Sequence, residues 1–202
     1  MWTLANTAHK LKRRGRTAEV PTFWLLTDAE RIPDPVAHVA KLPRGSAVIL
    51  RHYGNAQRTA LAAQLAHVCR TRGLILLVAG DWRLAAAVRA DGLHLPEYMA
   101  RIGLPPGARL WRRAGQRLLT VAAHSTRGLQ QAQRLNASTA LLAPVFPTLS
   151  HPNDATLGAR RFGVLTRAAH VPVIALGGIN EKTIAALMSS GCVGIAGVGF
   201  AG

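Results

Sequence analysis

The sequence predicts a single α/β domain that folds as a (β/α)8 barrel, or TIM barrel. Its 202 residues, of which 49% are hydrophobic, suffice for one domain with a large core. Short apolar runs alternate with amphipathic stretches about every 25 residues, which favours a closed parallel barrel over a doubly wound sheet. Because no low-complexity linker interrupts the chain, we expect residues 1–202 to form one domain with its barrel core at about 22–199.

The apolar runs have the length and continuity of strands that are covered on both faces. We expect eight strands, at Phe23–Thr27, Ala47–Arg51, Leu74–Ala79, Gly92–Leu95, Leu118–Ala122, Thr139–Val145, Val171–Leu176 and Val193–Val198.

Helices are expected between these strands, and several carry capping residues at their ends. Four are marked most clearly: Gln57–Arg70, which is rich in Ala and Leu; Trp82–Arg89 behind Asp81; the stretch from Ser125 to Leu135; and Glu181–Ser189 between Asn180 and Gly191.

Both ends of the sequence depart from an ideal barrel. Residues 1–14 form a basic extension that is predicted to be helical, with Leu4, Ala8 and Leu11 on one apolar stripe. We expect the eighth helix to be essentially missing, because the sequence stops at Gly202, just past the eighth predicted strand. We expect the N-terminal segment or a partner subunit, as in a homodimer, to cover that gap.

The charge balance favours small anionic ligands. The formal net charge is +16, but the arginines are scattered and aromatic residues make up only 5%, which argues against nucleic-acid binding. No apolar run approaches the roughly 20 residues of a membrane span, and the N-terminus lacks a signal-type apolar run. Cys69 and Cys192 show no metal spacing. These features predict a cytoplasmic protein that does not bind membranes.

Barrel enzymes place their active sites at the C-terminal ends of the strands. His124 ends the fifth strand, and an imidazole there suits proton transfer. Glycines after strands seven and eight could bind a phosphate through backbone N–H groups. The binding candidates at the strand ends are Arg51, Thr148, Ser150, His151, Gly177, Gly178, Gly197 and Gly199, and the same ends carry two carboxylates, Asp81 and Glu97.

Four strand-end motifs, WLLTD (24–28), ADGLHL (90–95), PVFPT (144–148) and VIALGGIN (173–180), resemble the thiamine phosphate synthase/TenI superfamily. The resemblance implies a (β/α)8 barrel with a thiazole phosphate site and a role in thiamine biosynthesis. The synthase joins hydroxymethylpyrimidine diphosphate to thiazole phosphate and releases pyrophosphate with Mg²⁺. Its relative TenI is a tautomerase that aromatises the thiazole phosphate.

The resemblance breaks at the positions that a synthase uses for the diphosphate and its metal. Tyr53 and His151 stand where a synthase has lysines, Gly80 replaces an asparagine, and Met99 replaces the second magnesium carboxylate. Ala122 replaces a serine. Losing these groups should weaken stabilisation of a leaving pyrophosphate. A histidine at position 151 predicts anion affinity that weakens as pH rises through roughly 6–7.

The positions expected around the thiazole phosphate are retained, and His124 stands where tautomerases carry their proton-transfer histidine. The first hypothesis is therefore a TenI-like tautomerase, or a degenerate synthase homologue, that needs no cofactor. An active synthase is the alternative, with Mg²⁺ held by Asp81 and Glu97, and with Arg51 and another arginine in place of the lysines. A non-catalytic, regulatory protein that binds a phosphorylated ligand is the third.

Overall fold

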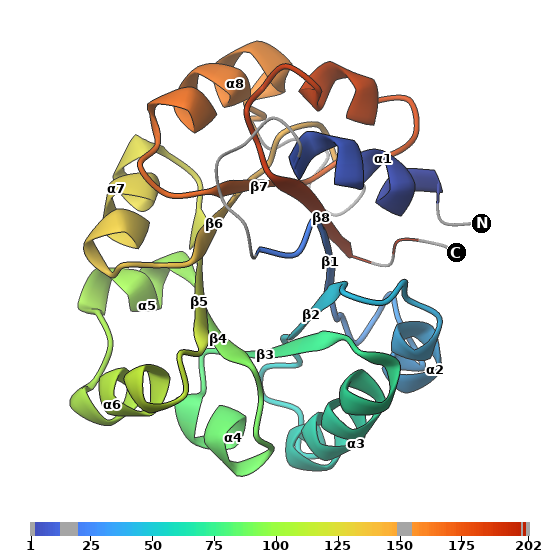
Figure 1. Ribbon diagram of the computed structural model, residues 1–202, viewed down its shortest axis with the longest axis vertical. Coiled ribbons are helices and arrows are strands. Elements are labelled where there is room, and N and C mark those ends of the chain that lie inside the picture. Colours follow the sequence, from blue (N-terminus) through green and yellow to red (C-terminus); the bar gives the residue numbers. More distant parts are fainter. Residues whose placement is uncertain (1–2, 13–19, 149–154, 199, 201–202) are drawn as a thin grey trace.

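Eight parallel strands close into a barrel in sequence order, which confirms the predicted fold (Figure 1). The computed structural model describes residues 3–12, 20–148, 155–198 and 200. The strands are β1 (Phe23–Leu26), β2 (Ala47–Leu50), β3 (Ile75–Ala79), β4 (Gly92–Leu95), β5 (Leu118–Ala123), β6 (Thr139–Leu142), β7 (Val173–Leu176) and β8 (Gly194–Val198).

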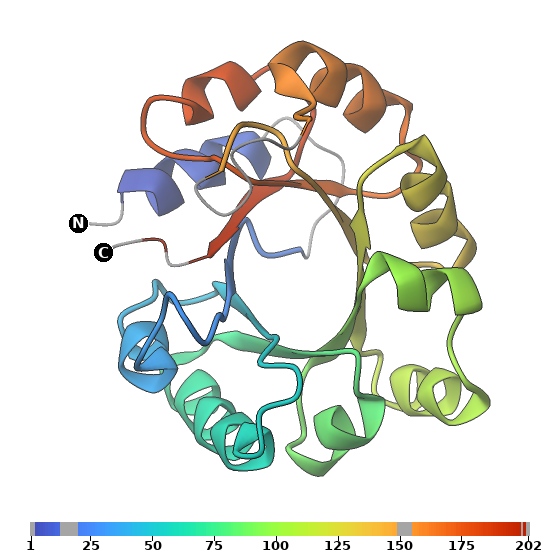
Figure 2. The same ribbon diagram turned by 180° about the vertical axis from the view of Figure 1, so that it is seen from behind.

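The helices form a ring around the outside of this barrel, as the two opposite views show (Figures 1 and 2). Across the described part of the chain, none combines the length and the apolar composition that a membrane span needs. They are α1 (Thr3–Lys12), α2 (Pro35–Ala40), α3 (Arg58–Arg72), α4 (Trp82–Ala87), α5 (Glu97–Ile102), α6 (Pro106–Ala114), α7 (Thr126–Arg134), α8 (Gly158–Ala168) and the 3₁₀ helix η1 (Ile184–Leu187).

Alternation along each strand separates two apolar layers. A large cluster joins one face of the strands to the helices. A second cluster draws its fully buried members from the other face and fills the barrel interior: Trp24, Leu26, Ala47, Ile49, Leu77, Ala79, Leu141, Ile174 and Ala196. Continuing the same alternation past the strand ends brings Asp28, Arg51, Asp81 and His124 to the inner side of the barrel mouth, which here means the C-terminal ends of the strands.

Two predicted helix caps are confirmed. The side chain of Ser125 accepts a hydrogen bond from Gly128 N at the start of α7. The side chain of Asp81 accepts one from Leu84 N, at 3.0 Å, at the start of α4. Each cap satisfies a backbone N–H that has no partner within its own helix.

The N-terminal helix is also confirmed. Helix α1 packs against β8 and β1, with Ala8 and Leu11 buried and Leu4 half-buried (Figure 1). Of the two candidates for covering β8, the N-terminal segment is therefore the one that the structure places there.

The sixth strand is shorter than predicted. It ends at Leu142 because Pro144, which follows a cis peptide bond, has no N–H to donate to a strand ladder. The chain beyond it still follows β7, since Val145 N donates to Leu176 O and Phe146 N to Gly177 O. The segment after β6 is thereby held beside the loop that follows β7.

The helix predicted at Glu181–Ser189 is wrong: the structure has turns and the short 3₁₀ helix η1. The Asn180 side chain accepts hydrogen bonds from the N–H groups of Lys182 and Thr183, and the Thr183 hydroxyl donates to Gly178 O. The two bonds to the Asn180 side chain are those of an N-cap, so the predicted cap is present although the turns after it are not α-helical. The same bonds fix the loop after β7.

Candidate active site

One side of the barrel mouth is organised by Glu97, the first residue of α5. One of its carboxylate oxygens lies 2.5 Å from His124 Nδ1 and also accepts a hydrogen bond from His124 N, at 3.1 Å. The other oxygen accepts from Arg101, one turn further along the helix, at 2.9 Å. Gly128, at the start of α7, packs closely on β5, since a Cβ there would lie 3.0 Å from Ala123 Cα. We call Glu97, Arg101 and His124 the imidazole side of the mouth.

The Glu97 carboxylate is ionised at neutral pH. Burial by itself would raise its pKa, but the hydrogen bonds and charges of Arg101 and His124 hold the pKa below its ordinary value. The carboxylate is only 13% exposed, whereas the His124 side chain is 57% exposed. A carboxylate beside Nδ1 favours the tautomer that carries its proton there. The other ring nitrogen, Nε2, is then able to accept a proton.

The opposite side of the mouth contains two arginines with carboxylate partners. Arg51 donates to Asp28 at 2.6 Å and to the carbonyl of Thr27 at 3.0 Å. Burial alone would raise the pKa of Asp28, but backbone N–H groups and the Arg51 guanidinium hold it below its ordinary value. Asp28 is therefore an anion paired with Arg51.

Arg58, the first residue of α3, is the second arginine. Its guanidinium donates to the carbonyl of Arg51 at 3.0 Å and to that of Ala79 at 2.5 Å, and it lies 4.0 Å from the Asp81 carboxylate. It is also 5.4 Å from the centre of the Tyr53 ring. We call Asp28, Arg51, Tyr53, Arg58 and Asp81 the arginine side of the mouth.

Three positions at which the resemblance breaks meet on this side. Gly80 has a left-handed backbone, with φ of 71°. A Cβ atom on it would lie 3.2 Å from Met99 Sδ and 3.5 Å from the Tyr53 ring. Met99 and Tyr53 therefore pack against the bare Cα of Gly80, in the space that an asparagine side chain would need.

This donor set fits a magnesium ion poorly. Mg²⁺ prefers oxygen ligands in octahedral geometry, and a thioether such as that of Met99 is a soft ligand. One Asp81 oxygen caps α4 and the other faces Arg58, while both Glu97 oxygens already accept hydrogen bonds. Within the described residues, no three His, Cys, Asp or Glu side chains gather as a metal site would require. The role of Asp81 and Glu97 as metal ligands remains a prediction.

The loop after β7 contains the glycines predicted to bind phosphate. Gly177 and Gly178 have φ of 100° and 65°. A Cβ on Gly178 would lie 2.7 Å from Phe146 Cβ and would clash with Pro147 O, so the approach of the chain after β6 already demands glycine there. Thr148, at the end of that segment, is half-buried. Phosphate binding by this loop stays a prediction.

The remaining binding candidates divide into two groups. Gly197 lies inside β8 rather than after it, in register with Leu25, and its Cα packs against the Phe200 ring. Packing therefore accounts for this glycine, and its phosphate role stays a prediction. Ser150, His151 and Gly199 lie outside the described residues.

Two further histidines near the mouth are buried. His94 bonds through Nδ1 to the Thr120 hydroxyl at 2.8 Å and is a hydrogen-bonded histidine of the core. Burial, with a smaller effect of the Arg51 charge, lowers its pKa to about 3. His52 bonds to the Thr27 hydroxyl, and burial likewise lowers its pKa. Both are neutral at pH 7. Of these three histidines, His124 is the one with an exposed imidazole.

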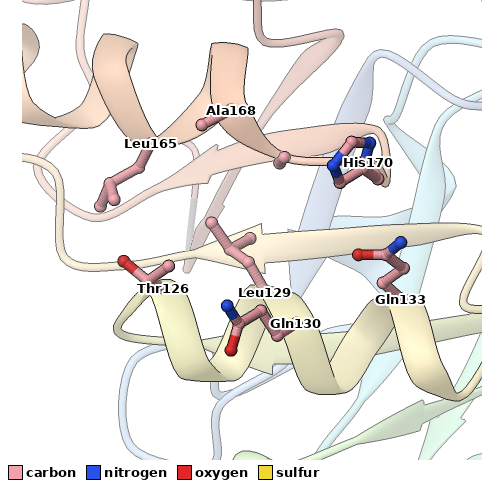
Figure 3. A pocket seen from close by; sticks show the side chains of 8 residues that line it. Thr126, Leu129, Gln130, Gln133, Leu165, Ala168 and His170 are labelled. Carbon is pink, nitrogen blue, oxygen red and sulfur yellow. The ribbon is translucent and has the colours of Figure 1, made fainter.

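A cavity of about 300 Å³ lies away from the mouth, on the outer face of the barrel (Figure 3). Helix α7 contributes Thr126, Leu129 and Gln133 to its lining, and the segment from α8 to β7 contributes Leu165 and His170. None of the predicted site residues lines it.

The closed barrel, with ionisable side chains gathered at the C-terminal ends of its strands, defines a (β/α)8 protein whose candidate site is the mouth. A family model described as thiamine monophosphate synthase matches residues 25–200. The chain therefore belongs to the thiamine monophosphate synthase family, which confirms the resemblance of its strand-end motifs.

Similar proteins bear the corresponding names. A thiamine-phosphate synthase of Parasynechococcus marenigrum is 33% identical over 83% of this chain, which spans only 48% of that protein. A putative thiamine-phosphate synthase 2 of Aquifex aeolicus is 28% identical over 89% of this chain and 97% of its own length. The structure of a thiamine phosphate pyrophosphorylase from Pyrococcus furiosus shares the fold, with a TM-score of 0.70 and 19% identity over 90% of this chain and 87% of that one.

Sequence reasoning did not identify Arg58 or Arg101 as site residues. Arg101 follows Glu97 by four residues, and that helical spacing signals an ion pair. Arg58 carries a weaker signal, since it opens a helix just after the second strand. Only the closed barrel shows that its guanidinium reaches back to the ends of β2 and β3.

Proposed function

We propose that this protein is a TenI-like thiazole tautomerase that binds a thiazole phosphate at the barrel mouth. The observation that carries the proposal is the contact between the Glu97 carboxylate and His124, at 2.5 Å from Nδ1 and 3.1 Å from the backbone N. A base oriented by a carboxylate is the arrangement that proton transfer needs.

The reaction moves one proton and shifts the double bonds of the thiazole ring until it is aromatic, so no group leaves. His124 removes a proton from the ring through Nε2, and the imidazolium that forms is stabilised by Glu97. The same imidazolium returns a proton at the second position. The glycine loop after β7 binds the phosphate through its backbone N–H groups and holds the ring near the imidazole.

The test is aromatisation of the thiazole phosphate tautomer, followed by proton NMR in wild-type protein and in His124→Ala. We expect the wild type to accelerate the reaction and the variant to lose roughly 10²- to 10⁴-fold of that rate. Equal rates for both proteins at the level of the uncatalysed reaction would refute the tautomerase. Ligand binding without any turnover would instead support a non-catalytic, regulatory protein.

An active thiamine phosphate synthase is the second candidate, and the names of the similar proteins favour it. It requires Mg²⁺-dependent release of pyrophosphate from hydroxymethylpyrimidine diphosphate and thiazole phosphate. Asp81→Ala and Glu97→Ala should each abolish that release. Failure of the wild type to release pyrophosphate from both substrates together would rule this candidate out.

A further inference from the structure

We propose that the arginine side of the mouth is a subsite for an uncharged planar ring, and that it rejects a magnesium-bound diphosphate. This inference deepens the proposed function, and it rests on that function only for the location of the site. It follows from three features of the described residues: the pairing of the charges, the apolar surface that Tyr53 and Met99 make, and the position of Arg58 beside the Tyr53 ring.

The charges on this side are already paired. Arg51 is bound to Asp28, and Arg58 lies beside Asp81 while donating to two backbone carbonyls. The two guanidiniums and the two carboxylates cancel in formal charge. A diphosphate would have to draw an arginine away from these partners, which would leave a carboxylate and carbonyl oxygens without their donors. The side therefore offers little net attraction to a polyanion.

Beside these ion pairs, the Tyr53 ring and the Met99 side chain form an apolar surface at the ends of β2 and β3. Tyr53 is 51% exposed and Met99 is half-buried, and both pack against the Cα of Gly80. Thioether and phenol groups make favourable contacts with the faces and edges of planar rings. Tyr98, on the same helix as Met99, is also exposed. An aromatic heterocycle would bury apolar area here without displacing an ion pair.

The ligand ring should be uncharged rather than cationic. Arg58 already places a guanidinium 5.4 Å from the centre of the Tyr53 ring, which is the attraction that a cationic ring would otherwise use. A neutral ring does not compete with that guanidinium.

The test compares the same ring with and without an attached diphosphate group. Calorimetric titrations at pH 8 would use hydroxymethylpyrimidine and its diphosphate, each with and without Mg²⁺. We expect wild-type protein to bind the two compounds with affinities within about threefold of each other, unchanged by Mg²⁺. A diphosphate that binds more than about tenfold more tightly in Mg²⁺, or a ring that does not bind, would overturn the proposal.

Variants locate the binding. Tyr53→Ala should lower the affinity for the ring by about tenfold, because stacking on one aromatic side chain contributes binding energy of that order. Tyr53→Phe should bind the ring like the wild type. Leu110→Ala, at an exposed position on α6, is the matched control. The triple variant Tyr53→Lys, Gly80→Asn, Met99→Asp should gain diphosphate affinity that depends on Mg²⁺. Ring affinity that Tyr53→Ala leaves unchanged would also refute the subsite.

Folding and function are read separately. Thermal melts followed by circular dichroism show whether each variant is folded before it is titrated. Wild-type protein that binds the ring but does not aromatise the thiazole would refute the tautomerase and support the subsite. Wild-type protein that aromatises the thiazole but prefers the diphosphate would do the reverse.

Discussion

The two sides of the barrel mouth use the same kinds of charged residues in opposite ways. On the imidazole side, one buried carboxylate holds His124 and leaves its ring 57% exposed. On the arginine side, each guanidinium donates to a backbone carbonyl and lies within 4.0 Å of a carboxylate, and the most exposed group is the Tyr53 ring. The number of charges is therefore a poor guide to chemistry here. What differs is whether a titratable atom remains accessible after its neighbours have been satisfied.

The largest expected effect is the loss of aromatisation rate in Glu97→Gln, a variant that tests whether Glu97 acts through His124. Glu97→Gln keeps an oxygen beside Nδ1 but removes the charge that stabilises the imidazolium. We expect a smaller loss of aromatisation rate than the roughly 10²- to 10⁴-fold loss in His124→Ala, and an acidic limb of the pH–rate profile that moves to lower pH.

The measurement is the pH dependence of kcat for the wild type and Glu97→Gln, with Arg101→Gln as the control on the same carboxylate. A purely structural role for Glu97 would lower kcat without moving the profile. If Glu97→Gln has the wild-type kcat and an unchanged pH profile, Glu97 does not act through His124, and the proposed difference between the two sides of the mouth is wrong.

The glycine loop after β7 gives the next largest effect. Gly178 and Gly54 both have left-handed backbones, but a Cβ would clash at Gly178 and would meet nothing within 4 Å at Gly54. We expect Gly178→Ala to lower the free energy of unfolding by about 3 kcal/mol, and Gly54→Ala by about 1 kcal/mol.

Urea unfolding of both variants separates conformational strain from the close approach of Phe146. Equal losses would mean that the backbone conformation alone requires glycine at position 178. In that case the segment after β6 can yield, and the mouth is less rigid on that side than the described contacts indicate.

His94 lies in the barrel interior but is influenced by the arginine side. Burial, together with the charge of Arg51, lowers the pKa of His94 to about 3. The unfolded chain binds a proton at its ordinary pKa of 6.5. The stability from neutral His94 is therefore fully present above pH 6.5 and is lost as pH falls toward 3, by at most about 1.4 kcal/mol per pH unit.

Urea titrations between pH 4 and pH 7 would measure this slope. His94→Asn should reduce it by close to one proton, while His170→Asn, at an exposed position, should leave it unchanged. An unaltered slope in His94→Asn would show that other groups govern the acid sensitivity.

The barrel was predictable because continuous apolar runs at regular spacing have few other ways to be buried on both faces. The position of His124 at the barrel mouth was predictable as well, because it follows a strand directly. The 3₁₀ geometry after Asn180 was not, because Asn180 makes the N-cap bonds that its sequence position indicates, yet the turns beyond it do not continue as an α-helix. The pairing of Arg58 with the ends of β2 and β3 depends on barrel closure, which no local pattern records.

The smallest expected effect concerns Asp81 on the arginine side, whose carboxylate both caps α4 and faces Arg58. Its Oδ1 caps α4 at 3.0 Å from Leu84 N. Asp81→Ala should lower the free energy of unfolding by about 1 kcal/mol, whereas Asp81→Asn, which keeps a capping oxygen, should cost only a few tenths. Urea unfolding at high and low salt measures both variants. If Asn costs as much as Ala, and the cost shrinks with salt, then the charge paired with Arg58 is what stabilises the fold, and the arginine side is held together by its ion pairs more than by its caps.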